Sequence, residues 1–135
     1  MNTSASVLTL FIAWALFLLV LMEVVRSLLV VSGATKSNEF KPDNANLSPF
    51  MQRLARAHAN CIESFPIFGG LLVVAIAVGH TEITDPLAPW LMLARVAQSI
   101  IHLASLSVVA VNVRFSFFAL QIAIAVHWAW ALIAL

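Results

Sequence analysis

The sequence predicts an all-α integral membrane protein that folds as a four-helix bundle, and three observations support this. Of its 135 residues, 62% are hydrophobic and only 10% are charged, whereas soluble domains carry about 25% charged residues. The mean hydropathy is +1.01. The apolar residues gather in four long runs near the ~20 residues that a helix needs to cross the hydrocarbon core, and no strand pattern competes with them.

Each apolar run has recognisable ends. The first is longer than the apolar part of a signal peptide and lacks a basic leader, so we expect it to be retained as a helix. The second opens on Ser48 and Pro49, a capping residue followed by proline in the first turn. The third follows Asp85 and Pro86. The predicted helices cover about residues 7–31, 48–78, 87–106 and 113–134 of one domain, 1–135.

Positive charge is concentrated at two of the three connections. Lys36 and Lys41 lie in the first connection, Arg53 follows it, and the third connection leads into Arg114, whereas the second connection has no lysine or arginine. The positive-inside rule therefore predicts that the first and third connections are cytoplasmic and that both termini lie on the opposite side. Tryptophans near that opposite side predict an interfacial aromatic belt: Trp90, Trp128 and Trp130.

A polar ridge opens the second helix. Residues three, four and seven apart share one helix face, so Arg53, Arg56, Asn60 and Glu63 are expected to align. Placing a charge in a bilayer costs roughly 2.5 to 3.5 kcal/mol on insertion scales, so the ridge should face a site or a partner instead of lipid. This ridge is the first candidate functional site.

The other helices carry polar stripes of their own. On the third helix Arg95, Gln98 and His102 share one face, and on the fourth Arg114 and Gln121 are seven residues apart. On the first helix, Glu23 and Arg26 have the spacing of a local ion pair, which is more consistent with structure than with catalysis.

These side chains indicate the chemistry of a ligand. Arginine binds carboxylates through two parallel hydrogen bonds and stays charged when desolvated, while Glu63 suits an ammonium group. A small zwitterion with an excess of negative charge fits this set. An arginine also lowers the pKa of a ligand thiol and favours the thiolate, the form that attacks electrophiles. Glutathione has all of these features.

Other classes of function are disfavoured. The net charge is +1 and there is no basic run, so no nucleic-acid partner is expected. The four histidines are scattered without ligand spacing, so no metal site is expected. The single cysteine, Cys61, excludes an intrachain disulfide and is expected to be a buried apolar residue.

Three strings stand out in the polar parts of the helices: R-A-H-A-N-C-I-E-S-F-P-I-F at residues 56–68, R-V-A-Q-S-I-I-H-L at 95–103 and V-R-F-S-F-F-A-L-Q at 113–121. They resemble the MAPEG family, the membrane-associated proteins of eicosanoid and glutathione metabolism. The resemblance extends over nearly the whole chain and is closest to bacterial members. It implies a four-helix protomer in a homotrimer, in the bacterial inner membrane, with one glutathione at each protomer interface toward the cytoplasmic side.

The resemblance also implies roles for individual residues. Arg114 would be the catalytic arginine that stabilises the thiolate of glutathione, assisted by Arg95. The residues expected to hold glutathione are Arg53, Arg56, His58, Asn60, Glu63, Gln98, His102 and Gln121. The implied activity is that of a glutathione transferase or peroxidase, a detoxification enzyme acting on lipophilic electrophiles or lipid hydroperoxides that arrive through the lipid bilayer.

The chain departs from the family pattern in ways that leave other functions open. It has no tyrosine, Ser64 stands where the family frequently has one, and Lys36 is the nearest substitute for an arginine after the first helix. Another thiol or an anionic lipid is therefore an alternative ligand. The alternative functions are a small four-helix transporter that uses Glu23 and a non-catalytic trimeric scaffold in which the polar stripes only join helices and subunits.

Overall fold

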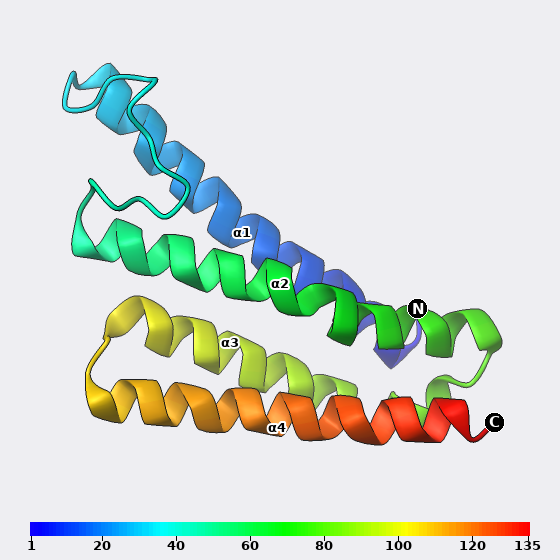
Figure 1. The fold of residues 1–135 in the computed structure, drawn as a ribbon. Helices are drawn as coiled ribbons and strands as arrows, with labels where there is room; N and C mark the ends of the chain where they lie inside the picture. Colours follow the sequence, from blue (N-terminus) through cyan, green and yellow to red (C-terminus); the bar gives the residue numbers. More distant parts are fainter.

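The computed structural model describes residues 1–135 and confirms an all-α fold with four helices. The helices alternate in direction, so both termini lie at one end of the molecule and the connections α1–α2 and α3–α4 lie at the other (Figure 1). A single 3₁₀ turn, η1, precedes the third helix. The elements are α1 Thr3–Val31, α2 Pro49–Val78, η1 Thr81–Ile83, α3 Ala88–Ala104 and α4 Val108–Ile133.

The four helices do not pack as a square. α1 lies against α2 and α3, α3 and α4 form a tight antiparallel pair, and α2 packs more closely on α3 than on α4 (Figure 1). The loose α2–α4 side is where the larger cavity described below opens. One core cluster joins all four helices toward the end that carries the termini and includes Phe11, Phe68 and Trp128. A second cluster, toward the other end, joins α1 and α2 around Leu18 and Leu54.

Side-chain caps explain where the helices begin. Ser48 Oγ accepts from Met51 N at 3.3 Å and Pro49 occupies the first turn, which confirms the predicted start of α2. Ser107 Oγ accepts from Ala110 N at 3.2 Å and starts α4 at Val108 instead of near residue 113. The predicted start was wrong because Asn112 was interpreted as part of a loop, although it lies inside the helix.

The third helix is a little shorter than the predicted 87–106. Three helices, α1, α2 and α4, are long and apolar enough to cross a membrane. α3 has 17 residues, about 25 Å of helix, which is at the lower end of the length range of membrane-spanning helices. Apart from η1, the chain between α2 and α3 is irregular.

Polar groups in this irregular segment are satisfied within the protein. The carboxylate of Asp85 accepts from Ser4 N at 2.8 Å and from Ser4 Oγ at 2.5 Å, and Thr84 Oγ1 lies 2.5 Å from Ser4 Oγ. Asp85 thereby also places negative charge at the N-terminus of α1, where the helix dipole favours it. Irregular backbone near the membrane is tolerated only where protein covers it, and Ser4 and Thr84 are both buried.

The first connection is held to α1 by Arg26. Its guanidinium donates to Asn44 Oδ1 from Nε at 3.0 Å, to Lys41 O at 3.1 Å and to Glu23 at 3.3 Å, and it stacks on the ring of Phe40. Asn44 is buried with a left-handed backbone (φ 56°) and donates to Met51 O at 2.7 Å. The predicted Glu23–Arg26 ion pair is confirmed, and its contacts are structural.

One further expectation is corrected. Trp128 does not belong to an interfacial belt, because it is 0% exposed in the core, whereas Trp90 and Trp130 are 60% and 76% exposed. On α2, Gly69 makes room for the ring of Phe65 on its own helix, since a Cβ at Gly69 would lie 2.6 Å from that ring.

Candidate functional site

Arg95 is the centre of the polar interior. It is 0% exposed, and its guanidinium donates to Asn60 Oδ1 at 2.5 Å and to Ser64 Oγ at 2.8 Å. No carboxylate pairs with it, since the chain's two ion pairs lie elsewhere. Three phenylalanine rings surround its Cζ at 5.5 to 5.7 Å, so aromatic faces and neutral oxygens stabilise the charge. These rings belong to Phe11, Phe68 and Phe118.

A chain of amides connects α4 to α2 through α3. Gln121 Nε2 donates to Gln98 Oε1 at 2.9 Å, and Gln98 Nε2 donates to Asn60 Oδ1 at 3.1 Å. Gln121 Nε2 also donates to the backbone carbonyl of Phe117 at 3.0 Å. Asn60 Oδ1 therefore accepts from both Arg95 and Gln98, so the predicted polar stripes of α2 and α3 meet at this atom, and the stripe of α4 joins them through Gln98.

A small polar cavity lies next to this amide chain and has a volume of about 220 Å³. Among the predicted site residues, Asn60, Gln98, His102 and Arg114 line it, together with the rings of Phe115 and Phe118. Arg114 Nη1 is buried and has no partner within the chain. Arg114 therefore brings a cation to the lining of the cavity, and no group of the chain binds this guanidinium nitrogen.

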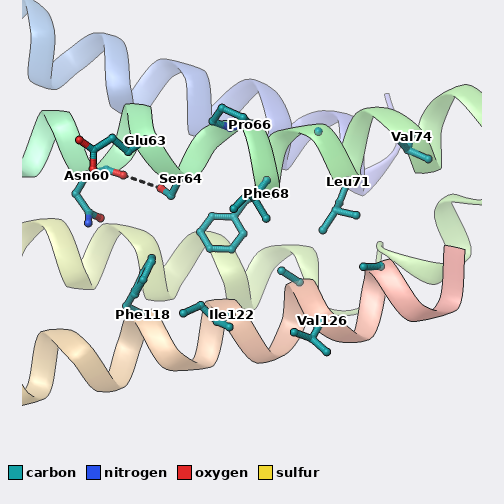
Figure 2. A pocket seen from close by; sticks show the side chains of 14 residues that line it. Asn60, Glu63, Ser64, Pro66, Phe68, Leu71, Val74, Phe118, Ile122 and Val126 are labelled. Atoms are coloured by element: carbon teal, nitrogen blue, oxygen red, sulfur yellow. Dashed lines mark hydrogen bonds between the residues drawn. The ribbon is translucent and has the colours of Figure 1, made fainter. Parts of the chain in front are cut away.

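A larger apolar groove of about 800 Å³ runs between α2 and α4 (Figure 2). Asn60, Glu63 and Ser64 form its polar end, and Val74 on α2 lies toward the opposite, apolar end (Figure 2). Ser64 donates to the carbonyl of Asn60 at 2.7 Å. Asn60 and Phe118 line both the groove and the polar cavity, so the two spaces share a wall.

Two of the predicted glutathione ligands on α2 lie at the surface of the chain. Arg56 and Glu63 are exposed, with Glu63 at the polar end of the groove. Arg56 lies four residues before Asn60, which places both side chains on the same face of α2. Glu63 therefore borders the groove, whereas Arg56 lines neither space.

The remaining predicted ligands lie apart from the two spaces. Arg53 Nε donates to the carbonyl of Leu103 at 2.7 Å and joins α2 to the end of α3. His58 lines a separate apolar cavity of about 250 Å³ formed by α1 and α2. His58 is two residues from Asn60, about 200° around the helix, so the two side chains point to different faces. Arg95 and Gln121 lie behind the cavity walls and line neither space.

Sequence reasoning missed the aromatic surroundings of Arg95. Phe68 lies four residues after Ser64, and Phe118 lies four residues after Arg114, so helical spacing places both rings on the faces of the polar residues. Phe11 on α1 has no comparable signal, because every face of that helix is apolar. Cys61 is buried as expected, with its sulfur 4.0 Å from Arg95 Nη1 and 3.6 Å from Ser99 Oγ.

An all-helical chain with three candidate membrane spans, and with a charged cavity beside an apolar groove, is a small integral membrane protein with two cavities between its helices. The chain belongs to the MAPEG family, whose model matches residues 4–134. It is therefore a membrane protein of the family of eicosanoid and glutathione metabolism. Searches of curated proteins and of solved structures returned no match.

Proposed function

We propose that the protein is a membrane-bound glutathione transferase or peroxidase that acts on lipophilic electrophiles or lipid hydroperoxides. One observation carries this proposal: the polar cavity and the apolar groove share a wall made by Asn60 and Phe118. A polar thiol co-substrate and an apolar second substrate would each find a matching space, with their reacting atoms meeting at that wall. Membership of the MAPEG family supports the same chemistry.

The donors of the polar cavity fit glutathione, which carries two carboxylates and one ammonium group. Arg114 Nη1 is buried without a partner, and the amide nitrogen of Asn60 donates no hydrogen bond within the chain. Both groups suit a carboxylate or a thiolate. Arg56 and Glu63 border these donors and would bind a carboxylate and the ammonium group.

In the proposed reaction, Arg114 stabilises negative charge on sulfur. Its guanidinium favours loss of the thiol proton to water and holds the resulting thiolate by a charge-assisted hydrogen bond. With an electrophile, the sulfur forms a bond to carbon while the leaving group departs with its electron pair. With a hydroperoxide, the sulfur takes one oxygen, the alcohol leaves, and a second glutathione yields the disulfide and water.

The exposure of Arg56 and Glu63 supports assembly with further copies of the chain. Both lie on a helix that is long and apolar enough to span a membrane, where an uncovered charge costs roughly 2.5 to 3.5 kcal/mol. A neighbouring protomer that packs on this face would cover the charges and close the site. We therefore propose the homotrimer of the family, with one glutathione at each interface.

The proposed orientation follows the positive-inside rule. Arg53 and Arg114 lie toward the end that carries the first and third connections, together with Lys36 and Lys41. That end would face the cytoplasm, where glutathione is abundant, and both termini would face the opposite side. A bacterial inner membrane is the proposed location.

The structure offers less support for a transporter. Glu23 was the candidate carboxylate for such a role, but it pairs with Arg26 at 3.3 Å beside the first connection. A carboxylate that binds and releases protons or cations during transport has to be free of a fixed cation. A scaffold role does not explain why Arg114 Nη1 is buried without a hydrogen-bond partner.

The test is a glutathione titration of the detergent-purified protein, followed by the ultraviolet absorbance of the thiolate. Wild type is expected to bind saturably with a thiolate signal, and Arg114→Ala is expected to lose that signal and roughly 10² to 10³ in kcat. Arg114→Lys keeps the charge without the planar fork and should recover part of the signal. Lys41→Ala, which removes an exposed cation remote from both cavities, is the matched control.

Turnover distinguishes the proposed function from mere binding. Conjugation of an aryl halide and reduction of a fatty-acid hydroperoxide should both depend on glutathione and on Arg114. Absence of binding at millimolar glutathione would refute the proposal. Proton-coupled efflux of cationic dyes that is lost in Glu23→Gln would support the transporter instead.

A further inference from the structure

The amide chain has a fixed polarity, which is set independently at each end. Arg95 can only donate, so the atom of Asn60 that faces it must be the oxygen. At the other end, the backbone carbonyl of Phe117 can only accept, so Gln121 must turn its nitrogen toward it. The two ends therefore impose the same direction on the residues between them.

The direction is consistent at Gln98, the middle of the chain. Its nitrogen donates to Asn60 Oδ1 at 3.1 Å, and its oxygen accepts from Gln121 Nε2 at 2.9 Å. Reversing Gln98 would bring its oxygen against Asn60 Oδ1 and its nitrogen against Gln121 Nε2, two repulsive contacts. The leftover atom of this arrangement is Gln121 Oε1, which is buried without a partner.

We propose that Arg95 and Gln121 together fix the orientation of the Asn60 side chain, with Gln121 acting through Gln98. In this orientation the NH₂ group of Asn60 faces the two cavities at the wall that they share. Asn60 Oδ1 is occupied by two donors, whereas Asn60 Nδ2 donates to no atom of the chain and belongs to a residue that lines both spaces. The wall therefore selects a ligand group that accepts hydrogen bonds, such as a carboxylate, a peptide carbonyl or a thiolate. It disfavours a ligand group that only donates.

Gln121 and Arg95 are positioning residues in this view. Both are fully buried and neither lines a cavity, so they act on the ligand only through the orientation of Asn60. This refines the glutathione contact that the sequence suggested for Gln121. The wall selects an acceptor group in any ligand that lies there. That this ligand is glutathione rests on the proposed function.

The first experiment does not need glutathione. In detergent-solubilised protein labelled with ¹⁵N at asparagine and glutamine side chains, NMR measures how fast each NH₂ group exchanges with water. The Asn60 NH₂ is expected to exchange faster than those of Gln98 and Gln121, whose protons are held in the chain. In Gln121→Glu, a carboxylate that only accepts should reverse Gln98 and set its oxygen against Asn60 Oδ1, in conflict with the donor Arg95 on the other side, so the Asn60 NH₂ signal should shift and lose its single orientation. Protection of Asn60 in wild type would overturn the inference.

The second experiment measures glutathione affinity for two substitutions of Gln121. Gln121→Glu reverses the polarity and is expected to raise Kd on the order of tenfold or more, since a hydrogen bond to a charged group is lost. Gln121→Met has similar length but imposes no direction, and Arg95 still fixes Asn60, so a loss of only a few-fold is expected. Asn38→Asp adds the same charge at an exposed position outside both cavities and controls for net charge.

The outcomes separate the inference from the proposed function. Equal losses for Gln121→Glu and Gln121→Met would mean that Gln121 only fills space, and would refute the positioning role. If wild type binds no glutathione while the exchange pattern holds, the proposed function fails and the acceptor-selective wall stands. Asn60→Asp gives a further check, because it turns the wall into an acceptor and should weaken glutathione binding more than Asn60→Ala.

Discussion

Replacing Trp128 tests the packing that holds α4 against the rest of the bundle. Its side chain is 0% exposed and lies in a core cluster that includes Val7, Phe11 and Leu91 of α1 and α3. Trp130, two residues later, is 76% exposed. The pair gives two tryptophans on one helix turn with opposite environments, and the comparison isolates burial from residue type.

The expected loss of unfolding free energy depends on whether the side chain that is removed was buried or exposed. In soluble cores, replacing tryptophan by alanine costs about 3 to 5 kcal/mol, of which part is transfer from water and part is the cavity left behind. Unfolded chains in detergent remain among hydrocarbon, so most of the transfer part is absent and about 2 to 3 kcal/mol remains for lost packing. Trp130→Ala should change the unfolding free energy by less than about 0.5 kcal/mol.

Unfolding by sodium dodecyl sulfate in mixed micelles, followed by far-ultraviolet circular dichroism, measures both values. Trp128→Phe provides a further check because it removes Nε1, which is buried without a partner. Removing that unsatisfied donor should stabilise the protein by about 1 to 3 kcal/mol, which largely offsets the packing lost with the smaller ring. Equal costs for Trp128→Ala and Trp130→Ala would refute the assignment of Trp128 to the core.

Three further predictions concern the groove and the connections. Ile122→Trp should fill the apolar groove and raise KM for a lipophilic substrate roughly tenfold without changing the Kd of glutathione. A parallel loss of glutathione binding would contradict the view that the two substrates bind in separate spaces. Asn44→Ala should lose the hydrogen bonds of Arg26 and strain a left-handed backbone, at about 1 to 3 kcal/mol, and speed proteolysis of the first connection. Asn44→Gly, which tolerates that backbone, should be milder. A hydrogen bond to His80 lowers the pKa of Glu82 below its ordinary value of 4.5. Wild type should therefore be more stable than Glu82→Gln at neutral pH, and this difference should vanish as the pH falls through the lowered pKa. A difference that persists in acid would contradict the pairing.

Much of the fold could be predicted because each predicted helix has a local signal. Hydropathy marks the apolar runs, and Ser48 with Pro49 marks the start of α2. The start of α4 also had a local signal, the cap at Ser107, but the polar Asn112 was interpreted as loop. The length of α3 had no such signal, since the chain before it is held by hydrogen bonds to Ser4, about 80 residues away in the chain, and η1 packs on α2 and α4.

Part of the candidate site could be predicted, namely the residues whose meeting depends on helical spacing alone. Asn60, Gln98 and Arg114 were expected on inward faces, and the structure brings them to one cavity. His58 was placed among them by family resemblance, although its spacing from Asn60 already argued for another face. Whether Trp128 near a helix end is buried or interfacial depends on α1 and α3, and no pattern within α4 reveals it.

Three of the four buried polar atoms without partners belong to the polar cluster: Arg95 Nε, Arg114 Nη1 and Gln121 Oε1. Each such atom costs about 1 to 3 kcal/mol, so apolar residues of similar volume would give a more stable bundle. A cluster that served only to join helices would be expected to satisfy its own donors and acceptors, as the Arg26–Asn44 contacts do. Arg95 and Gln121 line neither space, so a ligand in these cavities can reach only Arg114 among the three residues. The partnerless guanidinium nitrogen of a residue that lines the polar cavity supports the proposed anionic ligand over a purely structural role.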